Sequence, residues 1–571
     1  MLTSDSPAKE ARSPRVIIVG AGLAGISAGV ALKQQLGFTN FTIYEQADNV
    51  GGTWRDNTYP GCGSDVPGHW YSLSTELNPN WASYFVTQPE IQEYWQGIFH
   101  KHGLEAHTKL CTTFEEAEWD SERQLYRVRL RQRAVGRTYG DDVKDEGVLI
   151  EEEAEGLIMA IGGFMSPMYP KDLPGAEQFQ GAIWHSARWN HTFDLKGKRV
   201  GVIGNGCSAA QFVPKISEDP SVKVTNFCRT PQWFVPQGNY RYPGWAKWLF
   251  AHVPVVMRFY RNFIMTRADF SFLLFRKANT LVQNLVRKRC TDYIKHKAPK
   301  DAVERLIPNY PPGCKRIIVN PGYLDALNRP NVKLNWDGIE SIVEEGIKLK
   351  TGEVIPLDVI IFGTGYSIEP ANLRLIGSNG ITMQEYYKSQ GGITAYLGTC
   401  IPGFPNVFTL LGPNTATGHA SVIFTEEVQI NLAVQLLRPV IEGKAKSFEV
   451  TQASLDKYDS WLQGRLADSV WTECNSYYRQ DSDTKPRIVV TFPGPVSLFW
   501  WMARKPRWGE FKAVGADAWF STLKHQKRRS LAVTGLLLSS VLALGFYWPQ
   551  VAPTLFAGLS GAAQALKSFL H

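Results

Sequence analysis

The chain has 571 residues, which is too long for one compact domain and fits two or three. With 44% hydrophobic and 12% aromatic residues it can bury large cores, which excludes intrinsic disorder. Its 61 basic and 53 acidic residues leave a mild net charge of +8, and its first fifteen residues lack the apolar core of a secretory signal. Eight scattered cysteines without a Cys-x-x-Cys pair exclude a disulfide-dense module and a zinc ribbon, and they favour a reducing compartment; we predict no metal site.

A dinucleotide-binding unit is predicted at the start of the chain. A buried strand beginning at Arg15 runs into the turn Gly20-x-Gly22-x-x-Gly25, and a helix and a second strand ending in Glu45 follow. In such a unit Gly20 makes the tight turn, Gly22 lets a pyrophosphate approach the helix N-terminus, and Gly25 lets the helix pack on the strand. Glu45 stands where a carboxylate accepts hydrogen bonds from a ribose diol.

A second unit of the same kind contains Gly204-x-Gly206-x-Ser208. Its next strand, over 222–228, ends in Arg229, where the first unit has an acid. A guanidinium at this position pairs with a 2′-phosphate, which a carboxylate would repel; a solvated strand end is the alternative. The two units therefore predict FAD at the first glycine turn and NADPH at the second, which indicates a flavoprotein with a nicotinamide donor.

Two later turns predict that the chain returns to the first unit. A buried strand ends in Gly363-Thr364-Gly365, and an apolar strand over 406–411 precedes Gly412-Pro-Asn414; we expect Thr364, Gly365 and Asn414 to bind cofactor. The predicted fold is α/β, with two Rossmann-like domains and the NADP domain inserted in the FAD domain. The predicted boundaries are 15–160 and 356–515 for the FAD domain, 165–235 and 311–355 for the NADP domain, and 236–310 for a helical subdomain.

The segment 236–300 is both basic and aromatic. It has thirteen Lys or Arg residues and two Asp residues, a balance of +11. A helical core with a solvated basic face is the ordinary interpretation. A surface that lies against anionic lipid is the alternative. Charge alone would permit nucleic-acid binding, but no recognition motif supports it, and we predict no nucleic-acid partner.

Leu531–Trp548 is an uncharged run of eighteen residues that follows a basic cluster. As a helix it would extend about 27 Å, at the short end of what crosses a bilayer. We expect a single-pass membrane helix with the catalytic part facing the cytoplasm, and the endoplasmic reticulum is one candidate membrane. A buried or an interfacial C-terminal helix is the alternative.

Two longer patterns carry a resemblance to a known family. One is Phe179-x-Gly181-x-x-x-His185-x-x-x-Trp189, just before the second glycine turn. The other is Gly51-Gly52-Thr53-Trp54-x-x-x-x-Tyr59-Pro60-Gly61-x-x-x-Asp65. Together they resemble the flavoprotein monooxygenases with two dinucleotide domains, and within them the Baeyer–Villiger type. Asn190 departs from the Pro or Asp of the family pattern, and the likeness covers residues 15–515.

The resemblance implies roles for further residues. Gly52, Thr53 and Trp54 would lie at the cofactor, and Lys315 would assist Arg229 at the 2′-phosphate. In the family, the arginine matched by Arg316 sits over the flavin and stabilises a peroxide anion. Asp65 would position that arginine.

The implied reaction uses NADPH and O₂ to insert one oxygen atom into a hydrophobic ketone, giving an ester or lactone. A fixed guanidinium favours the anionic oxygen nucleophile that this reaction needs. His185 is expected to be structural.

Three other functions compete with this interpretation of the sequence. A flavin monooxygenase of the same fold could oxygenate nitrogen or sulfur, or hydroxylate its substrate. A flavin disulfide reductase would need a closely spaced cysteine pair, which the sequence lacks. A non-catalytic binding protein would have little use for both Arg229 and Lys315.

Overall fold

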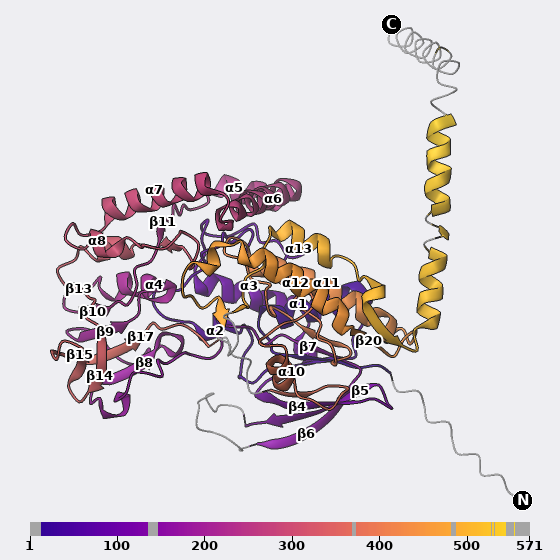
Figure 1. Ribbon diagram of the computed structural model, residues 1–571, viewed down its shortest axis with the longest axis horizontal. Helices are drawn as coiled ribbons and strands as arrows, with labels where there is room; N and C mark the ends of the chain where they lie inside the picture. The colour runs from indigo at the N-terminus through magenta and orange to yellow at the C-terminus, as the bar shows by residue number, and fades with distance from the viewer. Residues whose placement is uncertain are drawn as a thin grey trace, which may run out of the picture.

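The structure is a computed structural model of the chain. It describes residues 13–134, 147–367, 373–480, 487–526, 528–529, 531–543 and 553. Two parallel sheets lie beside each other, and a layer of helices runs along one side of the molecule (Figure 1). A single large apolar core joins the first sheet, much of the second sheet and these helices. A smaller core lies against the other side of the second sheet.

The first sheet has five parallel strands in the order β19-β7-β1-β2-β3. They are β1 (Val16–Val19), β2 (Phe41–Tyr44), β3 (Thr108–Lys109), β7 (Gly156–Met159) and β19 (Val407–Thr409). β1 and β7 are buried along their whole length, as expected for strands inside a covered parallel sheet. Helix α1 (Leu23–Leu36) follows the glycine turn and packs beside α11 (Val422–Ile441). The predicted first unit is confirmed.

The second sheet has the order β13-β10-β9-β17-β8, again with parallel pairs. Its strands are β8 (Ala182–His185), β9 (Arg199–Ile203), β10 (Lys223–Phe227), β13 (Val332–Asn335) and β17 (Val359–Phe362). Helix α4 (Cys207–Ile216) begins directly after its glycine turn. The predicted second unit is confirmed.

The predicted return to the first domain at residue 356 is wrong, because β17 belongs to the second sheet. Ile361 of β17 lies opposite Val202 of β9 and Trp184 of β8. A short buried apolar strand fits the middle of either sheet, so its composition could not assign it. The chain rejoins the first domain at β18 (Arg374–Ile376), which pairs with β4 (Thr112–Asp120).

The remaining strands form small sheets. β5 (Leu125–Gln132) and β6 (Val148–Ala154) extend the sheet of β18 and β4, and β14 (Ile339–Val343), β15 (Gly346–Leu349) and β16 (Val354–Pro356) form an antiparallel sheet. The pairs are β11 (Phe234–Pro236) with β12 (Ile318–Asn320), β20 (Ser447–Val450) with β23 (Phe511–Val514), and β21 (Arg479–Gln480) with β22 (Arg487–Ile488). Further helices are α2 (Thr53–Asp56), α3 (Gln88–Lys101), α9 (Tyr323–Ala326), α10 (Met383–Ser389), α12 (Gln452–Ala467) and α13 (Val496–Ala503). These elements surround the two sheets.

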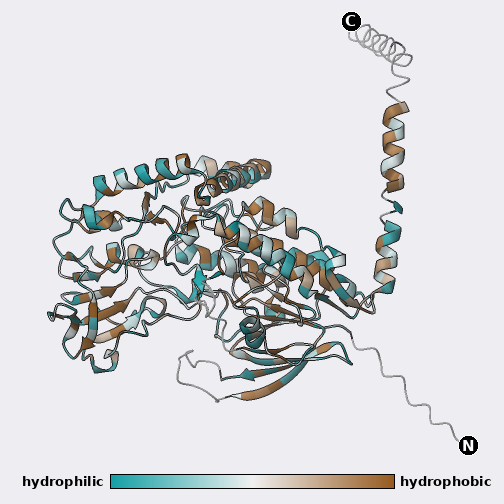
Figure 2. Cartoon of the chain, viewed as in Figure 1, coloured by the Kyte–Doolittle hydropathy of each residue, from teal (hydrophilic) through white to brown (hydrophobic). Residues whose placement is uncertain are grey.

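The predicted helical subdomain is confirmed. It contains α5 (Gly244–His252), α6 (Pro254–Phe270), the 3₁₀ helix η4 (Ser271–Phe275), α7 (Thr280–Lys297) and α8 (Val303–Leu306). α5, α6 and α7 lie along one edge of the molecule, where apolar and polar stretches alternate (Figure 2).

The predicted membrane helix over 531–548 is not supported. Residues 517–526 and 531–543 are helical, and 544–548 lie outside the described residues. Within the described part of the chain, no helix combines the length and the apolar character that crossing a bilayer requires. The described stretch 531–543 covers about 20 Å, whereas a hydrocarbon core is about 30 Å thick.

Candidate active site

The first glycine turn is closed to side chains. A Cβ on Gly20, whose φ is +101°, would lie 2.6 Å from the carbonyl oxygen of Ala160, and one on Gly25 would lie 1.9 Å from the carbonyl oxygen of Gly20. A Cβ on Gly52 would lie 2.9 Å from the Cα of Gly22. The two predicted glycine motifs therefore meet, and they leave bare backbone at the start of α1. This cradle fits the pyrophosphate of FAD.

Glu45 lies beside this turn and is 5% exposed. Its carboxylate accepts hydrogen bonds from the backbone N–H groups of Ala21 (2.8 Å) and Ala47 (3.0 Å) and from Nη1 of Arg55 (3.1 Å). These bonds tie the end of β2 to the glycine turn. The position agrees with the predicted ribose contact, which stays a prediction.

Thr53 and Trp54 follow Gly52 at the start of α2, next to the cradle. Trp54 is buried, and its Nε1–H donates to the hydroxyl of Tyr71 at 3.1 Å. Burial in this apolar layer raises the pKa of Tyr71, so the hydroxyl stays neutral. The segment predicted from the family pattern thus packs directly behind the first glycine turn.

The second glycine turn is built in the same way. A Cβ on Gly204 would lie 2.5 Å from the carbonyl oxygen of Gly363, whereas one on Gly206 would meet nothing within 4 Å. Thr364 and Gly365 therefore stand at the NADP turn, where β17 ends. Thr364 donates its hydroxyl to the carbonyl of Met168 at 2.5 Å, so its side chain holds the neighbouring segment.

Ser208 lies in the first turn of α4, close to Tyr59 of the first domain. The Tyr59 hydroxyl donates to Oε1 of Gln211 at 2.9 Å, and its ring packs edge-on against Phe212. Tyr59 is a fixed position of the second family pattern. Helix α4, which carries Ser208, is therefore joined to the first domain through Gln211.

Arg229 and Lys315 form a cationic pair near the second turn. Burial lowers the pKa of Lys315, and the charge of Arg229 lowers it further. The Lys315 ammonium donates to Oγ1 of Thr230 at 3.3 Å and lies 5.2 Å from the ring centre of Tyr310. Within the described residues neither cation has a carboxylate partner. The pair fits the 2′-phosphate of NADPH.

Asp65 and Arg316 form the ion pair that the resemblance implied. Nε and Nη2 of Arg316 donate to Oδ2 of Asp65 at 3.0 and 2.6 Å, and Nη1 donates to the carbonyl oxygen of Gly418 at 3.1 Å. The Arg316 side chain is 21% exposed and that of Asp65 30%. The pair is thus partly shielded but still open to a ligand.

The charge of Arg316 is secured by its surroundings. Burial opposes the charge, but the Asp65 carboxylate, Tyr478 and Tyr477 outweigh it, so the pKa of Arg316 is raised above its ordinary value.

Sequence reasoning missed both tyrosines, Gly418, and His419. It also missed Cys207, which is exposed and lies within electrostatic reach of Asp65 and Arg316. The tyrosines, Gly418 and His419 come from segments whose composition carries no signal, whereas Cys207 lies inside the second glycine motif.

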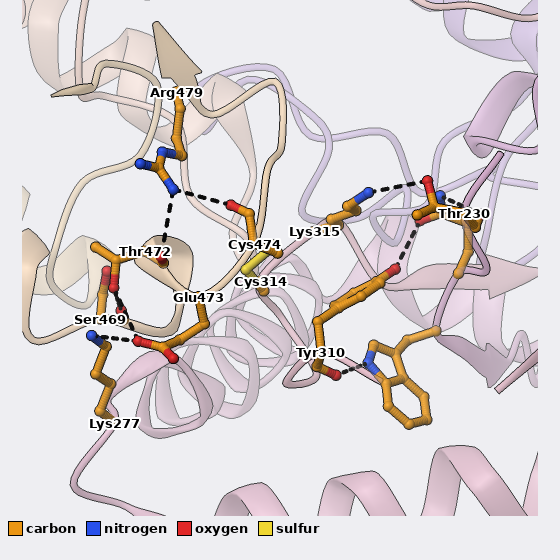
Figure 3. Close-up of a disulfide and its surroundings, with 12 residues drawn as sticks. Thr230, Lys277, Tyr310, Cys314, Lys315, Ser469, Thr472, Glu473, Cys474 and Arg479 are labelled. Carbon is orange, nitrogen blue, oxygen red and sulfur yellow. Dashed lines mark hydrogen bonds and ion pairs between the residues drawn. A yellow bond between two sulfur atoms is a disulfide. The ribbon is translucent and has the colours of Figure 1, made fainter. Parts of the chain in front are cut away.

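A disulfide joins Cys314 to Cys474 (Figure 3). Arg316 of the ion pair follows Cys314 by two residues. The two positions are 160 residues apart, so the absence of a short cysteine motif could not exclude it. The bond ties the segment that carries Lys315 and Arg316 to the segment that carries Tyr477 and Tyr478. The expectation that the cysteine scatter favours a reducing compartment is therefore not supported.

Two further expectations can be compared with the geometry. The Asn414 side-chain nitrogen donates to the carbonyl oxygens of Ile488 (2.9 Å) and Thr491 (3.1 Å), and its predicted cofactor contact stays a prediction. His185 is buried, its Nδ1 accepts from the backbone of Ala187, and burial lowers its pKa to about 4, which agrees with a structural role.

Trp189 packs against Trp184 and against Phe212 of α4. Trp189, the last residue of the first family pattern, thus packs on the NADP domain and is not part of the Asp65–Arg316 ion pair.

Comparisons with known proteins show the family to which the chain belongs. An NAD(P)-binding Rossmann-like domain model matches residues 18–87, and a flavin-binding monooxygenase-like model matches residues 143–374. The chain is 36% identical over 485 residues to a Baeyer–Villiger monooxygenase of Pseudomonas aeruginosa, covering 84% of this chain and 87% of the relative. It is 32% identical over 509 residues to one of Streptomyces coelicolor, covering 88% and 92%.

A solved cyclohexanone monooxygenase from Rhodococcus sp. Phi1, bound to NADP⁺, has the same fold. It is 24% identical with a TM-score of 0.74, and the match covers 88% of this chain and 99% of that one. A structure titled as OTEMO complexed with FAD and NADP gives the same TM-score at 23% identity, covering 88% and 100%. The chain belongs to the Baeyer–Villiger monooxygenases of the flavin-binding monooxygenase-like family, and it is an FAD-dependent, NADPH-consuming monooxygenase.

Proposed function

We propose that this monooxygenase carries out the Baeyer–Villiger oxidation of a hydrophobic ketone to an ester or lactone. The observation that supports it best is the Arg316 guanidinium held by Asp65 between the two dinucleotide domains. When bound, FAD accepts hydride from NADPH and activates O₂. The protein supplies the binding, the orientation and the local charge.

Arg316 supplies fixed positive charge where negative charge develops. Three of its five N–H groups are bonded to Asp65 and Gly418 among the described residues, which leaves two for the reacting oxygens. Because Asp65 and Gly418 hold the guanidinium in place, no reorganisation is needed when charge moves onto the carbonyl oxygen of the ketone. A positive charge here also disfavours protonation of a nearby oxygen anion.

Aromatic side chains adjoin the guanidinium. Phe275 of η4 packs so closely on Gly313 and Gly418 that a Cβ on either glycine would lie within 2.9 Å of its ring. The Phe275 ring also stacks on Trp471 at 5.1 Å. This surface supports a hydrophobic substrate and limits the water near Arg316.

Product analysis tests the proposal. Purified holoenzyme is supplied with NADPH, ¹⁸O₂ and a matched ketone and thioether. We expect an ester or lactone carrying one ¹⁸O atom, with much slower formation of sulfoxide. Sulfoxide formation with an untouched ketone would overturn the proposal in favour of heteroatom oxygenation, and an absence of NADPH oxidation would favour a binding protein.

A further inference from the structure

Helix α6 has apolar residues on two faces, and one of them is unpartnered. Met257 and Ile264 are buried in the core. Val255, Phe259 and Phe263 recur every four residues and are 77%, 72% and 56% exposed. An i, i+4, i+8 spacing places them on one stripe along the helix. This stripe faces away from the protein.

The stripe is part of a wider apolar surface. Its members are each 44–77% exposed: Trp245 and Trp248 of α5; Val255, Phe259, Phe263 and Phe270 of α6; Leu273 of η4; Leu281 and Leu285 of α7; and Trp500 and Trp501 of α13. We call these residues the helical apolar surface. Monomeric soluble proteins rarely expose contiguous apolar patches of more than a few hundred Å².

The elements that carry this surface are neighbours in space. α5 packs on α6, α6 packs on η4, and η4 packs on α7. Asp269, near the end of α6, accepts hydrogen bonds from the backbone N–H groups of Val496 (2.6 Å) and Ser497 (3.3 Å), which joins α13 to α6. α5, α6 and α7 also lie together along the same edge of the molecule in Figure 1.

Basic side chains accompany the apolar ones. Arg258 precedes Phe259 and is exposed, Arg276 follows η4, and Lys288 and Arg289 follow Leu285 on α7. Directly after α13, the Arg504 guanidinium lies 3.5 Å from the ring centre of Trp501. Trp and Tyr rings beside Arg and Lys are the side chains that settle at a membrane interface.

We propose that the helical apolar surface docks in the headgroup region of an anionic bilayer, with α5 and α6 lying along the membrane plane. The charge and the apolar character of the surface argue against two other binding partners. A second copy of this chain would bring a segment of balance +11 against another of the same sign. A nucleic acid would match the charge but not the Val, Phe, Leu and Trp side chains of the helical apolar surface. Anionic lipid matches both.

The surface continues into the candidate site. Phe270 and Leu273 flank Phe272, and the rings of Phe272 and Phe275 lie 5.8 and 5.6 Å from that of His419. His419 follows Gly418, which binds Arg316. A lipophilic substrate dissolved in the bilayer would therefore meet η4 before the ion pair. This consequence rests on the function proposed above, whereas docking itself does not.

Vesicle flotation tests the docking. The full-length holoenzyme is mixed with phosphatidylcholine vesicles and with vesicles containing 30% phosphatidylserine. We expect binding to the anionic vesicles, a loss of at least tenfold in partitioning for Phe259→Ser/Phe263→Ser, and about fivefold for Arg258→Gln. The matched control is Val148→Ser/Leu149→Ser, which removes two exposed apolar side chains of β6, away from this surface.

A labelling measurement separates this surface from the C-terminal tail, which all variants retain. Phe263→Cys and the control Leu149→Cys are alkylated with a water-soluble maleimide and quantified by peptide mass. Vesicles should slow labelling at 263 by at least fivefold and leave 149 unchanged. Equal labelling with and without vesicles, or flotation unaffected by Phe259→Ser/Phe263→Ser, would overturn the proposal. So would a dimer in light scattering that this variant dissociates. Neither measurement needs turnover. A protein that does not bind vesicles can therefore be told apart from one that does not oxidise a ketone.

Discussion

Arg316 places Nε and Nη2 on the same oxygen of Asp65, at 3.0 and 2.6 Å, although 251 positions separate the two residues. Asp65 belongs to the loop after α2 of the first domain, and Arg316 precedes β12 beside the second. The pair therefore joins a loop of the first domain to a segment beside the second. It holds in place the positive charge of Arg316, which the oxidation needs.

Replacing Arg316 by alanine should abolish oxygen transfer while NADPH is still bound and oxidised. Removing one preorganised donor to a developing anion typically costs about 10²–10³-fold in rate, and Arg316 offers two such N–H groups. The measurement compares product formed with NADPH consumed. Lys333→Ala, an exposed position of β13, is the matched control. Lactone formation at the original rate would remove Arg316 from the mechanism.

Asp65→Asn keeps the shape of the side chain but removes its charge. Arg316 then loses the ion pair that offsets its burial, so its guanidinium should become less well fixed. We expect a smaller loss of product than with Arg316→Ala, an unchanged KM for NADPH, and little additional loss in the double variant, because both residues act as one unit. Fully multiplicative effects in the double variant would show that the two residues act independently.

The sequence predicted the parts of the fold that rest on local pattern. Both strand, glycine turn and helix units are present, because the close approaches at Gly20 and Gly204 admit no side chain. β17 was assigned to the wrong sheet, since its buried run fits either one. Order along the chain is local, whereas strand neighbours are decided by packing between distant segments.

The candidate site was only partly predictable. Asp65, Arg316, Arg229 and Lys315 were found through strand ends and family patterns, and the structure brings each pair together. The cofactor contact predicted for Asn414 stays a prediction, and the structure adds that its side-chain nitrogen binds the backbone at 488–491. Tyr478 and the Cys314–Cys474 bond come from contacts across 160 residues or more, which no spacing in one sequence reveals.

Arg229→Ala should raise the KM for NADPH by at least tenfold and leave that for NADH nearly unchanged, because only NADPH carries the 2′-phosphate. Lys315→Ala should act in the same direction. The measurement is the ratio of kcat/KM for the two nucleotides in each variant. Equal losses with NADPH and NADH would show that the cations bind a part common to both.

Glu426 should make the protein less stable in alkali. It is buried on α11, its Oε2 has no hydrogen-bond partner among the described residues, and burial together with Glu427 raises its pKa to about 8. The folded state then holds the proton more tightly than the unfolded chain, so this stabilisation is complete below pH 4.5, the ordinary pKa, and is lost as the pH rises through about 8.

Glu426→Gln removes this titration. We expect its Tm to exceed that of the original protein by several degrees at pH 9, with the difference shrinking towards pH 5. Glu304→Gln, at an exposed position, is the control and should show no such trend. Tm curves that stay parallel across this range would contradict the assignment.

Reducing the Cys314–Cys474 bond should lower both stability and product yield. The bond closes a segment of 160 residues, and such a link typically contributes about 2–4 kcal/mol to the free energy of unfolding. It also holds Arg316, two residues after Cys314, against the segment that carries Tyr478. We therefore expect a dithiol reductant, or Cys314→Ser/Cys474→Ser, to lower the urea midpoint and to uncouple NADPH oxidation from product formation. The other six cysteines are unpaired, so the same reductant should leave the double serine variant unchanged. A reductant that affects both proteins alike would assign the effect to another group, such as the flavin.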